Sequence, residues 1–163
     1  IACFERSLLS GNSPYDQYIK NNNTNAMTDA QIRGMNLFFS DRTNCSTCHS
    51  GFNFTNYAFE NNGLYIQYAD IGRMRLTLKE EDMALFKVPG LRNIEMTGPY
   101  MHDGSIQTLQ QVIEHYQSGG KNHPHKNQIL KPLDLTSSEK SDLFEFLKAL
   151  TDDTFLTNPV FKY

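Results

Sequence analysis

The residues Cys45-Ser46-Thr47-Cys48-His49 form the pattern Cys-x-x-Cys-His, which brings two thiols and an imidazole together in one short segment. Two cysteines three positions apart fit one turn of helix, so both sulfur atoms reach the two vinyl groups at one edge of a porphyrin. The histidine that follows then points its imidazole at the iron. The sequence therefore predicts one covalently attached haem c, held by Cys45 and Cys48, with His49 as the proximal ligand of the haem iron.

Two other kinds of site use a Cys-x-x-Cys pair. A structural zinc site needs two further ligands, and the only other cysteine is Cys3, without a second Cys-x-x-Cys pair. A thioredoxin-like redox pair needs a βαβ frame, whereas this pair follows residues 37–41 at the end of an expected helix. Both interpretations are weaker than haem c. Once the haem is attached Cys3 is left alone, and we expect it to be a small buried residue of the first helix.

The composition excludes several classes of protein. Lys and Arg total 15 and Asp and Glu total 18, so the net charge is −3 and no basic stripe for nucleic acid exists. No apolar run reaches the roughly 18 residues that a membrane-spanning helix needs. Haem c is attached outside the bacterial cytoplasm, so we expect a periplasmic protein. The start at Ile1, without a signal-peptide pattern, leads us to expect a processed product or a piece of a longer chain.

Local signals predict an all-α domain with long loops. The 163 residues fit one domain with an extension. Residues 1–26 are punctuated by Gly, Pro and Asn and are typical of a linker or strap, with a short helix near its start. The domain itself is expected over residues 27–163, and no strand is expected.

Three longer helices are expected in this domain. They begin at Thr28, Thr108 and Thr136, each followed three residues later by Gln or Glu, which is the capping-box pattern. Gly34 lies in the middle of the first, where close approach of another helix is the usual reason. The stretch 51–86 is long and irregular, which is rare in a compact domain unless it has a task such as wrapping a large cofactor.

The second axial ligand of the haem iron decides what the haem does. Met raises the reduction potential and suits electron transfer, whereas Tyr stabilises oxidised iron. An open face would admit peroxide or oxygen. On motif chemistry alone Met101 leads, because it lies in a rigid loop that contains proline. The other candidates downstream of the motif are His102, His115, Tyr116, His123 and His125.

Further blocks of sequence accompany the haem motif. They are Phe4–Leu8, Ser13–Asp16, Cys45–His49, Phe86–Asn93, Thr97–Gly104 and Thr108–Ile113. In this order and spacing they resemble the C-terminal haem domain of the bacterial dihaem cytochrome c peroxidase and MauG-type family. The resemblance spans nearly the whole chain and is more specific than the haem motif alone.

The resemblance implies a cytochrome c-like fold and a distal ligand. The first and last helices of the domain should cross near Gly34, with Phe146 or Leu147 as the partner. In the family the distal ligand comes from the end of the helix after the Pro-Tyr-x-His block, and is Met in the peroxidases and Tyr in MauG. That position falls on Tyr116 here. Tyr116 is therefore the distal candidate, Met101 the alternative, and an open face the third option.

The resemblance also implies contacts beyond the two axial ligands. Arg92 is a candidate for a haem propionate, because its fork matches a carboxylate, and a contact to backbone carbonyls is the alternative. His102 corresponds to a haem-adjacent histidine that forms a hydrogen bond instead of ligating the iron. The family holds a calcium ion between its two haem domains, and the carbonyls of Thr97 and Pro99 match two of its ligands. The side-chain ligand would come from the other domain.

The function implied by the resemblance is electron transfer within a dihaem cytochrome c peroxidase or MauG-like protein. The family's enzymes carry two haem motifs, whereas this chain has one and has no Trp. The peroxidatic haem is absent from it. The expected electron partner is the N-terminal haem domain of the same family or a small redox protein. The alternative is a cytochrome c peroxidase-type oxidoreductase in which peroxide activates this haem directly, and a structural zinc domain is the third interpretation.

Overall fold

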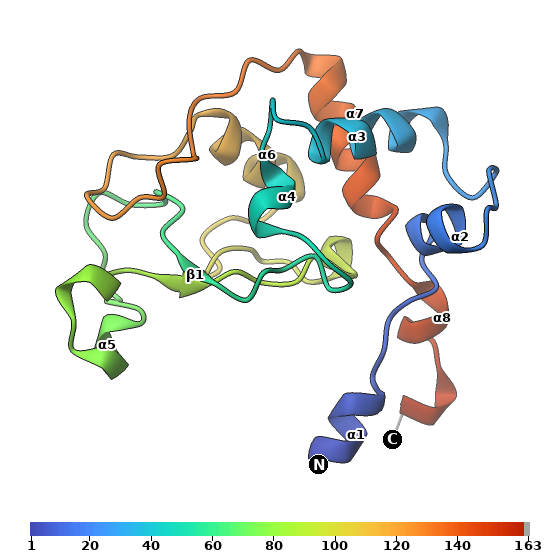
Figure 1. The fold of residues 1–163 in the computed structure, drawn as a ribbon, viewed down its shortest axis with the longest axis horizontal. Helices are drawn as coiled ribbons and strands as arrows, with labels where there is room; N and C mark the ends of the chain where they lie inside the picture. Colours follow the sequence, from blue (N-terminus) through green and yellow to red (C-terminus); the bar gives the residue numbers. More distant parts are fainter. Residues whose placement is uncertain (162–163) are drawn as a thin grey trace.

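The computed structural model describes residues 1–161 and is mostly helical (Figure 1). In chain order its elements are α1 (Ala2–Ser7), α2 (Pro14–Lys20), α3 (Asp29–Phe38), α4 (Cys45–Cys48), β1 (Phe59–Glu60), α5 (Met74–Thr77), the 3-10 helix η1 (Glu80–Asp82), β2 (Phe86–Lys87), η2 (Ile94–Met96), α6 (Leu109–Gln117), α7 (Ser137–Lys148), α8 (Asp153–Leu156) and η3 (Pro159–Phe161). α3 and α7 pack along each other, and α6 packs against α7. The expected all-α class is therefore confirmed.

The one departure from that class, within residues 1–161, is a small antiparallel sheet. β1 pairs with β2, with Phe59 opposite Lys87 and Glu60 opposite Phe86. Two residues per strand are too few to produce a visible alternation of apolar and polar side chains. The pair joins an inner part of the irregular stretch 51–86 to the end of that stretch.

Capping boxes define the starts of the longer helices. The predicted starts at Thr28, Thr108 and Thr136 are confirmed, and in each the threonine and the third helical residue exchange hydrogen bonds. α2 was not expected, because the Gly, Pro and Asn residues within 1–26 are typical of a linker or strap. Pro14 is in fact the first residue of the helix, a position where proline is favoured, and Ser13 and Asp16 form the box.

Gly34 is the point where α3 crosses α7. An ideal Cβ built on Gly34 would lie 1.9 Å from the backbone oxygen of Asp142 and 2.9 Å from Cβ of Phe146. Only a residue without a side chain fits this approach. The predicted crossing, with Phe146 as the partner, is thus confirmed. Phe146 is fully buried in a core that both helices share with Phe38, Phe54 and Leu143.

The two ends of the described chain lie together, away from the main body (Figure 1). The rings of Phe4 in α1 and Phe161 in η3 are in edge contact, with centroids 6.3 Å apart. α1 contains no buried residue, and Cys3 is exposed. The expectation that Cys3 is buried is therefore wrong, because α1 has no apolar core to enter.

Asp152 ties the N-terminal strap to the domain. Its carboxylate, 2% exposed as a residue, accepts hydrogen bonds from the backbone N–H groups of Gly11 and Asn12 at 3.0 and 2.9 Å. It also accepts from the Ser10 hydroxyl and, within its own turn, from Thr154. Residues 10–12 are thus held by one buried carboxylate. The division into a strap over 1–26 and a domain over 27–163 stays a prediction.

Replacing Asp152 with asparagine should reduce the acid sensitivity of the fold. Burial raises the pKa of Asp152, but its hydrogen bonds outweigh this, so the pKa lies below its usual value. Such a group stabilises the folded state above the unfolded-state pKa of about 4, and this stabilisation is lost as the pH falls through the folded-state pKa. An amide NH₂ cannot accept these bonds. Thermal unfolding of the variant should show a lower Tm at pH 7 and a smaller drop towards pH ~2. Equal drops in both proteins would contradict the role of this carboxylate.

Residues 49–108 contain little regular structure and many strained backbone positions. Phe54, Tyr57, Leu78, Ala84 and Met101 all have positive φ angles, between 52° and 73°. L-residues with bulky side chains rarely adopt this left-handed conformation. The stretch was expected to be irregular, and the structure shows it as a set of tight turns that run below α4 and α6 in Figure 1.

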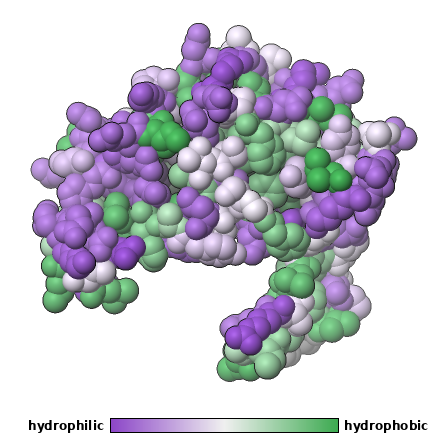
Figure 2. All heavy atoms as spheres, viewed as in Figure 1, coloured by the Kyte–Doolittle hydropathy of each residue, from purple (hydrophilic) through white to green (hydrophobic). Residues whose placement is uncertain are grey.

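Polar and apolar side chains are mixed over most of the face in Figure 2, with apolar side chains gathered at its lower projections. One projection carries α5, where Leu76 and Leu78 are 86% and 84% exposed. Among residues 1–161, no helix combines the length and the apolar character needed to cross a membrane.

Candidate haem site

The Cys-x-x-Cys pair forms one helical turn, α4, as its spacing predicts. Asn44 precedes it in the left-handed conformation, and the N–H of His49 donates to the carbonyl of Cys45 at 3.0 Å. Both thiols are free and half-buried. Burial raises the pKa of each, so both are neutral thiols in this fold. The turn offers two thiols and an imidazole to a group lying beside α4.

The His49 ring is fixed by a backbone carbonyl. Its Nδ1 lies 2.9 Å from the oxygen of Phe54, which accepts a hydrogen bond, so Nδ1 carries the proton. The other nitrogen, Nε2, is therefore the unprotonated one. Burial lowers the pKa of His49, which favours the neutral imidazole that a metal needs as a ligand. This arrangement is the usual one for a metal-ligating histidine, whose second nitrogen donates to a carbonyl or carboxylate.

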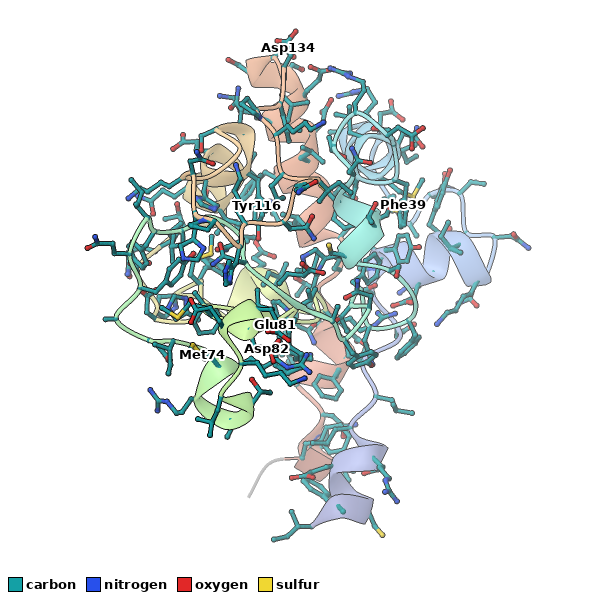
Figure 3. All side chains as sticks on the ribbon, turned by 60° about the vertical axis from the view of Figure 1, so that its left-hand side comes forward. Phe39, Met74, Glu81, Asp82, Tyr116 and Asp134 are labelled. Atoms are coloured by element: carbon teal, nitrogen blue, oxygen red, sulfur yellow. The ribbon has the colours of Figure 1, made fainter. Side chains whose placement is uncertain are left out.

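Tyr116, the distal candidate, lies in the last turn of α6. Burial raises the pKa of Tyr116, and the nearby Cys45 and Cys48 raise it further, while a hydrogen bond with Asn62 lowers it. Figure 3 shows Tyr116 near the centre of the molecule, by the inner side of α6.

Met101, the alternative distal ligand, contacts Asn62. Its sulfur accepts a hydrogen bond from Nδ2 of Asn62 at 3.1 Å. The backbone oxygen of Asn62 accepts from Nε2 of His115 at 3.0 Å. Asn62 thus touches both distal candidates, Tyr116 and Met101. No motif in the sequence marks Asn62 for this contact.

The other histidines lie in an aromatic cluster to one side. His102 is exposed and stacks on Phe86, with ring centroids 3.9 Å apart. His123 is buried, its ring edge against Tyr68, and its Nδ1 accepts a hydrogen bond from the N–H of His125 at 3.1 Å. The hydrogen-bonding role of His102 towards haem stays a prediction.

Arg92 points to a protein carboxylate. Its guanidinium donates twice to Asp16, at 2.7 and 3.0 Å, and its Nε donates to the carbonyl of Phe52 at 2.7 Å. The side chain is 9% exposed. The contact with the Phe52 carbonyl agrees with the predicted alternative, and a contact of Arg92 with a haem propionate stays a prediction. No motif marks Asp16 as a partner of Arg92, because the two residues are far apart in the chain.

The expected calcium ligands Thr97 and Pro99 lie in an exposed turn between η2 and α6. Within residues 1–161, no group of three or more His, Cys, Asp or Glu side chains gathers where a metal ion could bind. The zinc interpretation of Cys45 and Cys48 therefore lacks its further ligands in this part of the chain. A calcium ion at Thr97 and Pro99 would rest on carbonyl oxygens and stays a prediction.

The residues present fit a covalent haem c. The two thiols are free, His49 has one nitrogen bound to a carbonyl and the other available, and Asn62 contacts Met101, one of the two distal candidates. The sequence identified the thiols, the imidazole and both distal candidates. It missed the Phe54 carbonyl and Asn62, because a backbone oxygen and a turn asparagine carry no motif.

Comparisons with known proteins cover most of the chain. No protein-family model matches the chain. It is 36% identical to the methylamine utilization protein MauG of Methylorubrum extorquens, over 92% of this chain and 42% of that protein. It is 40% identical to the cytochrome c peroxidase Ccp of Escherichia coli, over 73% of this chain and 27% of that protein. The chain spans less than half the length of these curated relatives.

Solved structures show the same fold. A MauG-like protein associated with microbial copper homeostasis superposes with a TM-score of 0.88 and 34% identity, over 98% of this chain and 57% of that one. The dihaem peroxidase BthA of Burkholderia thailandensis superposes with a TM-score of 0.70 over 88% of this chain. Its identity is 21%, so the likeness is one of fold.

Proposed function

Because this chain belongs to the family of MauG and dihaem cytochrome c peroxidases, we propose that it binds one haem c covalently through Cys45 and Cys48, with His49 as the proximal ligand. A bound haem c supplies one-electron oxidation and reduction at its iron. The proposed role of the domain is to relay electrons to or from a second haem. One observation supports the proposed haem binding: the Phe54 carbonyl fixes the His49 ring, and two free thiols lie in the adjoining turn α4.

The protein residues divide the work at this site. The thiols of Cys45 and Cys48 bind the porphyrin edge and set its orientation. The Phe54 carbonyl keeps the proton on Nδ1 of His49, so Nε2 is available to the iron. Tyr116 or Met101 would serve as the second ligand of the haem iron and would limit access of small molecules to it.

The proposed partner is another redox centre outside this chain. The chain contains one Cys-x-x-Cys-His motif and spans less than half of its relatives MauG and Ccp. An N-terminal haem domain of the same family, or a small redox protein, is therefore the electron partner that we propose. The proposed location is the periplasm, where haem c is attached, and calcium at Thr97 and Pro99 is proposed as a structural ion between the two domains.

The experiment that tests haem binding is expression in a bacterium that attaches haem c in its periplasm. The purified protein should be red, show sharp reduced c-type absorption bands, and carry the mass of one haem after denaturation. A colourless protein with two unmodified thiols at residues 45 and 48 would overturn the proposal. Zinc uptake by such a protein would favour the structural zinc interpretation.

Replacing Tyr116 with phenylalanine should open the distal face of the haem iron. The variant should bind cyanide or imidazole at least about tenfold more tightly, because a phenol bound to iron must otherwise be displaced at a cost above about 1.4 kcal/mol. Met101→Leu is the matched control, since Met101 touches the same Asn62. A gain in Met101→Leu, with Tyr116→Phe unchanged, would make Met101 the ligand.

The second candidate function is a peroxide-activated haem enzyme. The feature that favours it is Tyr116 in the last turn of α6, because tyrosine is the axial ligand in catalase. Consumption of hydrogen peroxide by the purified haem-loaded chain, without an added partner, would support this function. An iron centre that only exchanges electrons with a small redox protein would support the relay.

A further inference from the structure

The turn at residues 51–54, which follows the haem motif, carries the carbonyl that binds His49. Gly51 and Phe54 both have positive φ angles, 68° and 52°, and the N–H of Phe54 donates to the carbonyl of Gly51 at 3.1 Å. The carbonyl of Phe54 fixes His49. Any movement of this turn therefore moves the hydrogen-bond acceptor of the proximal imidazole.

Arg92 binds this turn through Phe52. Its Nε donates to the Phe52 carbonyl at 2.7 Å, and its guanidinium carbon lies 4.1 Å from the centre of the Phe52 ring. The neighbouring Leu91 N–H donates to the carbonyl of Asn53 at 3.3 Å. Arg92 and Leu91 therefore bind the carbonyls of Phe52 and Asn53. The next carbonyl in the chain, that of Phe54, is the one that accepts from His49.

Asp16, in α2, holds Arg92 in place. Its carboxylate is 2% exposed and accepts two hydrogen bonds from Arg92. It also accepts from the N–H and hydroxyl of Ser13 and pairs with Lys20 at 3.2 Å. Burial raises the pKa of Asp16, but the bonds from Arg92 and Ser13 lower it to about 2. Asp16 is therefore charged and fully engaged at neutral pH.

α2 touches the same turn a second time through packing. The Tyr15 ring lies in edge contact with Phe54, with centroids 5.1 Å apart. The N–H of Tyr15 donates to the carbonyl of Ala149 at 3.1 Å, which anchors α2 to the end of α7. α2 therefore contacts residues 52–54 in two ways. Asp16 binds Arg92, which binds the Phe52 carbonyl, and the Tyr15 ring packs against Phe54.

We infer that Asp16 and Arg92 are positioning residues for the proximal haem ligand: through the Phe52–Phe54 turn they hold the carbonyl that orients His49 and sets its electron donation to the iron. The inference rests on the proposed haem binding. A histidine whose Nδ1–H donates to a fixed acceptor is a more basic ligand and stabilises oxidised iron. Loosening the turn should therefore shift the reduction potential of the haem iron upward.

The test compares two buried aspartates that each accept two hydrogen bonds from an arginine. Asp16→Asn breaks the chain of contacts to the turn. Asp142→Asn is the matched control, because Asp142 is 7% exposed and accepts from Arg33 at 2.8 Å twice, between α3 and α7. Both variants should lose stability. Only Asp16→Asn should raise the reduction potential of the haem iron. Only this variant should also speed amide hydrogen exchange in residues 50–56, by about tenfold or more.

A second variant keeps the test decisive if Asp16→Asn folds poorly. Arg92→Lys retains a positive charge beside Asp16, but an ammonium group cannot donate to Asp16 and to Phe52 in the geometry of a guanidinium fork. It should shift the potential in the same direction by a smaller amount. An unchanged potential in Asp16→Asn and Arg92→Lys, or an equal shift in Asp142→Asn, would overturn the inference.

Failure of the proposed function gives a different result. A wild-type chain without haem would refute haem binding itself. The exchange rates of residues 50–56 in wild-type and Asp16→Asn chains would still report whether Asp16 holds the turn. Unchanged exchange would then refute the link from α2 to His49.

Discussion

Replacing Gly34 with alanine should lower the free energy of unfolding by about 3 kcal/mol or more. The new Cβ would lie 1.9 Å from the Asp142 oxygen and 2.5 Å from its carbonyl carbon, so a methyl group collides with backbone rather than with a side chain that could rotate away. α3 and α7 would have to separate, and the fully buried Phe146 between them would lose contacts. Denaturant unfolding of wild type and variant measures the difference.

The sign of this effect separates packing from helix propensity. In an exposed helix interior the same substitution stabilises by about 1 kcal/mol, because glycine is the poorer helix former. Asn36→Ala, at an exposed position of α3, introduces the same side chain without a facing helix and is the control. It should change the unfolding free energy by no more than about 0.5 kcal/mol. A Gly34→Ala chain as stable as wild type would refute the close crossing.

Replacing Cys45 and Cys48 together with serine should abolish covalent haem attachment. Serine hydroxyls form no thioether, so no bond to the vinyl groups remains. Intact-mass measurement of the denatured protein should give the mass of the bare polypeptide, and haem staining of a denaturing gel should be lost. Because His49 is retained, residual red colour that is removed by denaturation would show non-covalent binding alone.

Cys3 supplies the matched control for this experiment. It is a third free cysteine, exposed on α1. Cys3→Ser should keep the full haem content and the same absorption bands as wild type. Loss of haem in Cys3→Ser, or haem retained on the denatured double variant, would contradict the assignment of α4 as the attachment site.

Much of the helical frame could be predicted because its signals are local. A threonine followed three residues later by Gln or Glu marks the start of a helix, and α3, α6 and α7 begin at such threonines. The glycine inside an otherwise regular helix indicated the crossing at Gly34. The strap helix α2 was missed, because Pro14 is compatible with both a turn and the first position of a helix. Only the contacts of Ser13 and Asp16 decide between them.

The haem site divides in the same way. Cys45, Cys48 and His49 are adjacent in sequence, so their spacing alone predicts their chemistry. The Phe54 carbonyl, Asn62 and the Asp16–Arg92 pair act across the fold, and no residue type announces a backbone acceptor. Arg92 had two predicted partners, a propionate and backbone carbonyls. It uses one carbonyl and a carboxylate 76 positions away, and only the folded chain brings these groups together.

The strained backbone of residues 49–108 has a consequence for the life of the protein in the cell. Phe54, Tyr57, Leu78, Ala84 and Met101 each hold a left-handed conformation that costs about 1–2 kcal/mol. Few helices or strands in this stretch offset that cost, so the proposed haem c is the natural source of the missing contacts. We expect a chain that fails to receive haem to keep α3 and α7 and to be cut by proteases within residues 49–108. Haem attachment would then determine the lifetime of the chain, because chains without haem would be degraded and chains with haem would persist.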